Sequence, residues 1–168
     1  MWALSLGLRE GEILGLRWED LDFDKRLVHI RASLQRIDKK LQLVGPKTKK
    51  SRRTLPIPEN LLSSLRAHRT RQLEEKLQSG ADWREHGLVF TSSKGTPLFA
   101  RNVIRSFHRL LANAKLKRCR FHDLRHSCAT FLLAKKVPAR VVMDILGHSN
   151  IRASIRRCGN IKTAYPCW

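Results

Sequence analysis

Three short clusters of arginine, lysine and histidine hold the side chains best suited to act on an anion. The first is Gly7-Leu8-Arg9-Glu10-Gly11-Glu12. Arg9 follows a glycine turn at the start of an expected helix, where the first backbone N–H groups also favour a negative charge. A surface arginine paired with Glu12 or Glu19 is the alternative interpretation of this cluster.

The second cluster is His122-Asp123-Leu124-Arg125-His126. On a helix, His122 and Arg125 stand at positions i and i+3 and project from one face. A guanidinium can bind two oxygens of a phosphate at once, and an imidazole can transfer a proton near neutral pH. The pattern therefore suits phosphate chemistry, and a buried polar face with capping duties is the alternative.

The third cluster, Leu146-Gly147-His148-Ser149, directly follows an expected helix. A histidine at the end of a helix often compensates the helix dipole, so His148 alone does not indicate catalysis. His122 and His126 also match part of the zinc-protease pattern H-E-x-x-H. Because Asp123 replaces the glutamate of that pattern and no obvious third ligand follows, we expect no metal and no cofactor.

Hydrophobic spacing predicts an α+β fold, mainly helical with one small antiparallel β-sheet, that positions these clusters. A short helix is expected from about Glu10, after the end of an earlier one, and longer helices over residues 58–80, 100–114, 122–135 and 138–147. Strands are expected over residues 27–34, 41–44 and 54–57, with a short one over 88–91.

Two helices carry a predicted apolar stripe. The stripe of the helix over 58–80 comprises Leu61, Leu62, Leu65, Leu73 and Leu77, and that of the helix over 122–135 comprises Leu124, Cys128, Phe131 and Leu132. The residues Gly45-Pro46-Lys47-Thr48-Lys49-Lys50-Ser51 stand between two expected strands, so we interpret them as a basic hairpin tip.

The charge balance points to a polyanionic partner. The 168 residues include 34 Lys and Arg against 14 Asp and Glu, a formal net charge of +20. Four basic runs, at 46–53, 66–71, 115–120 and 152–157, favour nucleic acid through phosphate neutralisation. We expect no membrane association, since no apolar run approaches the length of a membrane span and no basic amphipathic helix dominates. Aromatic residues make up only 7%, which disfavours an RNA-binding sheet.

The four cysteines, Cys119, Cys128, Cys158 and Cys167, show no C-x-x-C spacing. They are too sparse for a disulfide scaffold, so free thiols in a reducing compartment are expected. The N-terminus also lacks a secretory signal pattern. We therefore expect a cytoplasmic protein.

Taken together, the clusters resemble the tyrosine recombinase (phage integrase) family. The similar stretches are GLREGEILGLRWEDLDF, PKTKKSRRTLPIP, VFTSSKGTP and FHDLRHSCATFLLAKKVPARVVMDILGHSNI, which span residues 7–151. The resemblance implies DNA binding and site-specific DNA recombination or integration by a mobile element. In that reaction the strands are cleaved and rejoined through a covalent 3′-phosphotyrosyl intermediate on double-stranded DNA.

The resemblance also implies a role for each catalytic residue. Arg9 and Arg125 would hold the scissile phosphate, and Lys47 would protonate the departing 5′ oxygen. His122 and His148 would move protons and donate hydrogen bonds to the phosphate. The basic segment with Lys49, Lys50, Arg52 and Arg53 would contact DNA.

The nucleophile departs from the family pattern. The family's tyrosine follows the third cluster's histidine by nine or ten residues, and Cys158 stands at the aligned position here. The only tyrosine of the chain is Tyr165. We therefore expect impaired cleavage, and a DNA-binding remnant of an integrase without catalysis is the alternative.

The expected organisation is a catalytic domain over residues 1–151, without its first helix and the family's core-binding domain, followed by a degenerate tail over residues 152–168. Family members act as tetramers on paired sites. A homo-oligomer is expected here to the extent that the altered tail permits it.

Overall fold

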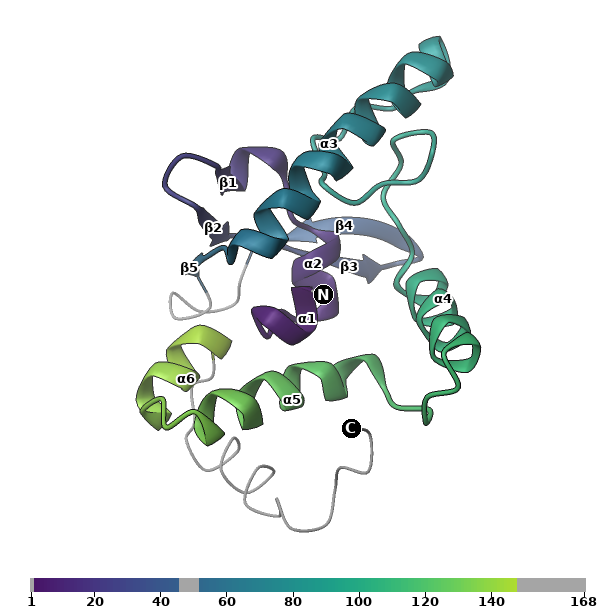
Figure 1. Cartoon of the computed structure of the whole chain (residues 1–168). Helices are drawn as coiled ribbons and strands as arrows, with labels where there is room; N and C mark the ends of the chain where they lie inside the picture. Colours follow the sequence, from purple (N-terminus) through teal and green to yellow (C-terminus); the bar gives the residue numbers. More distant parts are fainter. Residues whose placement is uncertain (1, 46–51, 148–168) are drawn as a thin grey trace. The chain divides into compact units, whose positions relative to one another are not determined.

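The computed structural model describes residues 2–45 and 52–147 (Figure 1). The chain divides into two compact units. The first unit joins residues 1–10 to the chain from Arg101 onward, and the second comprises Gly11–Ala100. The α+β class predicted from the sequence is confirmed, because helices predominate and the strands form small antiparallel sheets.

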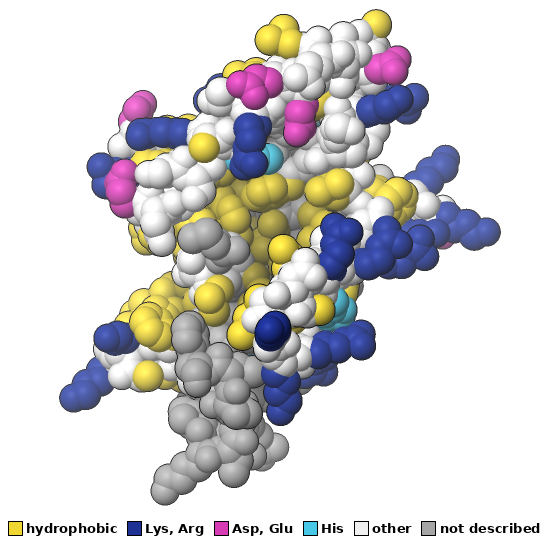
Figure 2. Space-filling view, turned by 45° about the vertical axis from the view of Figure 1, so that its right-hand side comes forward, with side chains coloured by type: hydrophobic (Ala, Val, Ile, Leu, Met, Phe, Trp, Pro, Cys, Tyr) yellow, Lys and Arg dark blue, Asp and Glu magenta, His cyan; other side chains and the backbone are white. Residues whose placement is uncertain are grey.

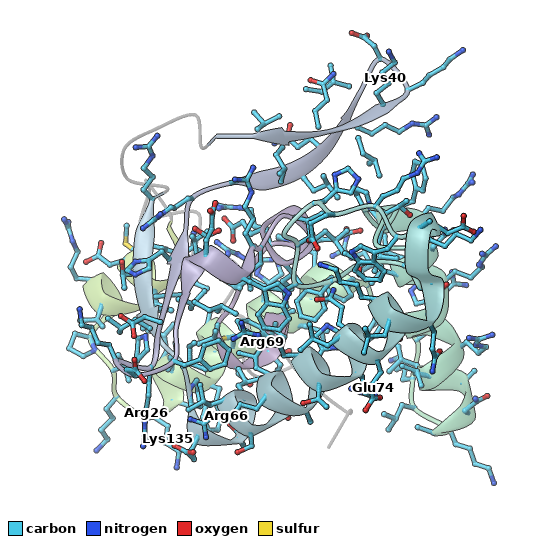
Figure 3. All side chains as sticks on the ribbon, turned by 90° about the horizontal axis from the view of Figure 1, so that it is seen from above. Arg26, Lys40, Arg66, Arg69, Glu74 and Lys135 are labelled. Carbon is cyan, nitrogen blue, oxygen red and sulfur yellow. The ribbon has the colours of Figure 1, made fainter. Side chains whose placement is uncertain are left out.

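The second unit contains two separate antiparallel sheets. A three-stranded sheet has the order β1-β2-β5, formed by Leu21–Asp22, Leu27–Ile30 and Arg53–Pro56. A two-stranded sheet pairs β3 (Ser33–Ile37) with β4 (Lys40–Val44), and Figure 3 shows Lys40 at the far end of this hairpin. The prediction of one sheet with a continuous strand over 27–34 is therefore wrong.

The chain changes sheets between residues 30 and 33. Val28 pairs with Leu55 in one sheet, and Leu34 pairs with Leu43 in the other. Val28 and Leu34 are both buried, so the alternation of apolar residues continues across the break while the hydrogen-bonding partner changes.

The predicted hairpin with Lys47 at its tip is also corrected. Its flanking strands β4 and β5 pair with β3 and β2, respectively, and not with each other. The segment between them therefore connects two sheets. Residues 46–51 lie outside the described residues.

Two glycines bring the N-terminal end of the second unit close to β3. Helix α2 (Glu10–Leu14) carries Gly11, and Gly15 follows it. A Cβ atom on Gly11 would lie 2.8 Å from the carbonyl oxygen of Leu34, and one on Gly15 would lie 2.7 Å from its nitrogen. The absence of side chains at these two positions therefore lets α2 approach the backbone of β3 directly.

Helix α3 (Glu59–Ser79) confirms the longest predicted helix, but its apolar side is shorter than expected. Leu61, Leu62 and Leu65 are buried, whereas Leu73 and Leu77 are 54% and 82% exposed. In this second half of α3 the buried contact is polar, because Gln72 reaches the segment after the helix.

Gln72 replaces the expected leucine contacts with hydrogen bonds. Its side-chain amide donates to the carbonyls of Leu88 and Val89 and to Thr91 Oγ1, and its oxygen accepts from Trp18 Nε1 at 2.7 Å. The expected strand over 88–91 is reduced to isolated bridges, Arg17 with Leu88 and Thr91 with Pro97. Short 3-10 helices, η1 (Trp18–Asp20) and η3 (Gly80–Asp82), complete this unit.

The first unit is helical. It comprises α1 (Trp2–Ser5), α4 (Ala100–Asn113, from Arg101 onward), α5 (Phe121–Ala134) and α6 (Ala139–Leu146). Helix α1 packs against the middle of α5, and α6 packs against the C-terminal part of α5, as Figure 1 shows. Ala129, Val142 and Leu146 form the buried centre between α5 and α6.

The stripe predicted for α5 is only partly correct. Cys128 is buried, as expected, but Phe131 is 62% exposed. The largest fully buried side chain in this unit belongs to Arg125, whose Nη1 and Nη2 donate to main-chain carbonyls inside it. The buried face of α5 therefore includes a charged residue, Arg125, beside Cys128 and Ala129.

Candidate phosphate-binding site

Arg125 joins three parts of the first unit. The residue is 1% exposed, and its guanidinium donates from Nη1 to the carbonyl of Gly7 and from Nη2 to the carbonyl of Leu146. A buried guanidinium is stable only when acceptors replace its water. The two carbonyls supply this compensation and fix the plane of the side chain.

Arg9 reaches the same turn from the other end of the sequence. Its Nη2 donates to the carbonyl of Gly147 at 3.3 Å, and the side chain is half-buried. Arg9 and Arg125 therefore bind the carbonyls of neighbouring residues, Gly147 and Leu146. The structure thus brings together two of the five residues expected at the site, Arg9 and Arg125, at the end of α6.

Both turns that receive these arginines have left-handed backbone conformations. The φ angle is +61° at Gly7 and +63° at Gly147. Gly147 ends α6 as its C-cap, with its N–H directed at the carbonyls of Met143 and Asp144. Glycine adopts these angles at little cost, whereas most residues with a Cβ atom do not, so the glycines in GLR and LGH have a geometric explanation.

The N-terminus of α5 places His122 at the surface. Its ring lies edge-on to that of His126, with centroids 4.8 Å apart. Asp123 caps this end of the helix by accepting from the backbone N–H of Arg120 at 2.9 Å and from its guanidinium. Burial raises the pKa of Asp123, but the Arg120 hydrogen bonds and charge outweigh burial, so its pKa is lowered.

Burial shifts two further groups in this unit. The thiol of Cys128, which lies near the Ser5 carbonyl, has a raised pKa because burial disfavours the thiolate. Burial likewise raises the pKa of the Glu10 carboxyl, next to Arg9. Within residues 2–45 and 52–147, no three His, Cys, Asp or Glu side chains gather closely enough to hold a metal ion.

Several predicted site residues lie outside the described residues, namely Lys47, Lys49, Lys50, His148, Cys158 and Tyr165. Arg52 is exposed, as a DNA contact requires. Arg53 is not exposed, because its side chain is buried in an ion pair. This burial does not fit the DNA-binding role predicted for Arg53 from the sequence.

Arg53 and Glu12 form a buried ion pair inside the second unit. The guanidinium binds both carboxylate oxygens, at 2.8 and 3.1 Å, and the side chains of Arg53 and Glu12 are only 6% and 7% exposed. Glu19, the other acid considered as a partner of Arg9, pairs with Arg17 at 2.9 Å. Glu12, the glutamate of the GLR-x-x-E stretch, therefore binds Arg53 at the start of β5.

A basic surface covers α4 and the segment after it, and only the run at 115–120 was predicted from the sequence. Seven Lys and Arg residues and no acid occur between residues 100 and 122, and all seven are exposed: Arg101, Arg105, Arg109, Lys115, Lys117, Arg118 and Arg120. The signal was present, since Arg101, Arg105 and Arg109 recur every four residues on one helix face. Figure 2 shows dark-blue side chains gathered over α4.

These features can be compared with known proteins. The family model described as "Phage integrase family" matches residues 1–157. This stretch contains Arg9, Arg125 and the α4 surface. The chain belongs to the phage integrase family.

Curated relatives of this integrase-family chain are tyrosine recombinases and integrases. It is 38% identical to the tyrosine recombinase XerC-like protein of Caldanaerobacter subterraneus subsp. tengcongensis, over 89% of this chain and 41% of the relative. It is 33% identical to the tyrosine recombinase XerA of Thermococcus kodakarensis, over 86% of this chain and 44% of that one. The chain therefore spans less than half the length of these relatives.

Solved structures show the same fold. The integrase of the Tn1549 transposon, in complex with transposon right end DNA, superposes with a TM-score of 0.79 at 23% identity, over 92% of this chain and 51% of that one. A crystal structure of XerA recombinase superposes with a TM-score of 0.72 at 18% identity, over 98% of this chain and 57% of that one. Among the described helices of the integrase-family chain, none is long and apolar enough to cross a membrane.

Proposed function

We propose that this chain is the catalytic part of a site-specific tyrosine recombinase that cleaves and rejoins double-stranded DNA. The observation that carries the proposal is the convergence of Arg9 and Arg125 on the Leu146–Gly147 turn. Two guanidiniums bound to the carbonyls of consecutive residues suit the non-bridging oxygens of one phosphate, whose charge increases in the transition state. The catalytic domain comprises residues 1–151, and residues 152–168 form its altered tail.

Each residue has a role in the proposed reaction. Arg9 and Arg125 bind the scissile phosphate, while His122 and His148 donate hydrogen bonds to it and move protons. A nucleophile attacks phosphorus and displaces the 5′ oxygen, which takes a proton from Lys47. The phosphoryl group is then bonded to the protein, so the energy of the broken linkage is retained for rejoining without a cofactor.

The position of the nucleophile decides between this function and a second candidate, a DNA-binding remnant without catalysis. Cys158 at the aligned tyrosine position favours the second candidate. We expect the chain to bind DNA and to cleave it poorly, because a thiolate replaces the phenol there.

Restoring the tyrosine tests this expectation. Cys158→Tyr is expected to raise the rate of covalent protein–DNA adduct formation at least ~100-fold, on the scale of a missing nucleophile. The measurement uses nicked suicide duplexes with random sequence around the nick, from which covalently retained strands are sequenced. Because the random library supplies all sites, the assay needs no known target.

Two controls complete the experiment. Cys158→Phe has the aromatic ring without the hydroxyl and should stay at the level of the unaltered chain. An adduct that the unaltered chain already forms, and that Tyr165→Phe abolishes, would identify Tyr165 as the nucleophile. Intact DNA binding with no adduct in Cys158→Tyr would support the remnant instead.

The basic α4 surface is proposed to bind the DNA duplex together with Lys49, Lys50 and Arg52. Changing Arg101, Arg105 and Arg109 to alanine is expected to reduce the slope of log K against log salt by about 2–3, since each phosphate contact contributes about 0.9. The measurement is duplex binding by fluorescence anisotropy at several salt concentrations.

A matched triple variant separates this surface from total charge. Arg26, Arg36 and Arg84 are exposed in the second unit and lie outside the basic runs, and Arg26 is labelled in Figure 3. Their change to alanine removes the same charge. An equal loss of slope in both triples would mean that α4 has no special part in binding.

The remaining properties follow from the proposed reaction. Rejoining of exchanged strands needs paired DNA sites, and assembly of several copies of the chain, a tetramer on two sites, would supply the active centres. Such a protein would work beside the nucleoid in the cytoplasm of a bacterium, as part of a mobile element.

A further inference from the structure

We propose that the Gly7 and Gly147 turns are positioning elements for the two site arginines. Their left-handed backbones present main-chain carbonyls that fix Arg9 and Arg125 before an anion arrives. This inference rests on the proposed function, because it assigns the geometry of the phosphate site to two residues that themselves contact no phosphate.

The hydrogen-bond acceptors of both site arginines include main-chain carbonyls. Arg125 donates to the carbonyls of Gly7 and Leu146, and Arg9 donates to the carbonyl of Gly147. These carbonyls are neutral, so they orient the guanidiniums without cancelling their charge. An anion-binding site benefits from that arrangement, because fixed donors need no reorganisation when the charge arrives.

The end of α6 supplies two of these carbonyls. Leu146 and Gly147 are consecutive, yet their carbonyls serve two different arginines. The left-handed conformation of Gly147, with φ +63° and ψ +45°, turns the chain between the two carbonyls. Most residues with a Cβ atom pay about 1 kcal/mol or more in this conformation, whereas asparagine tolerates it.

The Gly7 turn lies close against the end of α6. A Cβ atom on Gly7 would clash with Leu146 Cδ2 and would lie 3.4 Å from Cys128 Sγ. Leu146 is 1% exposed and belongs to the centre between α5 and α6. The two turns therefore touch each other directly, and Arg125 hydrogen-bonds to both, so a change in one turn reaches both arginines.

The test compares Gly147→Ala with Gly147→Asn. Nitrogen-15 NMR of the arginine side chains gives the first readout, with Arg125 assigned by the signals lost in Arg125→Lys. Because both Nη atoms are held by carbonyls, the unaltered chain should show resolved Nη signals for Arg125. Gly147→Ala should merge them, and Gly147→Asn should keep them.

Affinity for inorganic phosphate gives the second readout. Gly147→Ala is expected to raise its dissociation constant about tenfold, and Gly147→Asn less than about twofold. A purely structural role would lower stability without changing the affinity of the folded protein. The inference is wrong if Gly147→Ala keeps both the resolved signals and the affinity, or if Gly147→Asn loses as much as Gly147→Ala.

The two readouts also separate this inference from the proposed function. If the unaltered chain binds no phosphate, the proposed function loses its anion site. The Nη signals then still decide whether the turns hold the arginines.

Discussion

Arg125→Lys is expected to unfold at a clearly lower urea concentration than the unaltered chain, with a loss of about 2–5 kcal/mol in the free energy of unfolding. A lysine keeps the charge but has one compact ammonium group in place of the planar fork. It cannot reach both the Gly7 and the Leu146 carbonyls, so one buried acceptor loses its partner. The urea midpoint measures this loss, and the slope m should be unchanged.

The same substitution should remove catalysis. In the Cys158→Tyr background, Arg125→Lys is expected to lower the rate of adduct formation by about 100- to 1000-fold, as for loss of one oxyanion donor. Arg140→Lys is the matched control, because Arg140 is an exposed arginine on α6 of the same unit. Equal urea midpoints for the two variants would show that the buried hydrogen bonds of Arg125 contribute little.

The helices of this protein could be predicted because their signals are local. Pro58 and Pro138 precede α3 and α6, and Gly147 ends α6, as the sequence indicated. The clusters around Arg9 and Arg125 were recognised for the same reason, since each lies within a few residues. Their meeting at the end of α6 depends on tertiary packing, and the family resemblance alone suggested it.

The strand partners could not be predicted, because they depend on distant parts of the chain. The alternation from Leu27 to Leu34 fits one long strand equally well, and nothing local marks the change of sheet near Arg31. Likewise, Leu73 and Leu77 continue a helical repeat, but the segment that packs there offers carbonyls that bind Gln72. The apolar pattern indicates which residues can be buried. The segment that packs against them determines which residues are buried in the folded protein.

Arg53 illustrates why a basic run is a poor guide to a single side chain. The run at 46–53 was interpreted as one DNA-contacting surface, yet its last residue is the first of β5 and points at Glu12. The two are 41 residues apart, so no local spacing connects them. Charge counts predict the partner of the whole protein, whereas burial decides the role of each arginine.

Glu12→Ala is expected to lower the free energy of unfolding by about 3–5 kcal/mol, because it leaves the guanidinium of Arg53 buried without its carboxylate. Both oxygens of Glu12 bind Arg53, and the two side chains are nearly inaccessible to water. Glu19→Ala is the control, since the exposed Arg17–Glu19 pair should contribute about 0–1 kcal/mol. Urea unfolding of both variants gives the comparison.

A double variant tests whether the cost comes from the unpaired charge. Glu12→Leu combined with Arg53→Met removes both charges and fills similar space, so it should recover most of the stability lost in Glu12→Ala. If the double variant is as unstable as Glu12→Ala, the ion pair itself holds α2 against β5 and apolar packing cannot replace it. Recovery would instead mean that the instability of Glu12→Ala comes from the unpaired charge of Arg53.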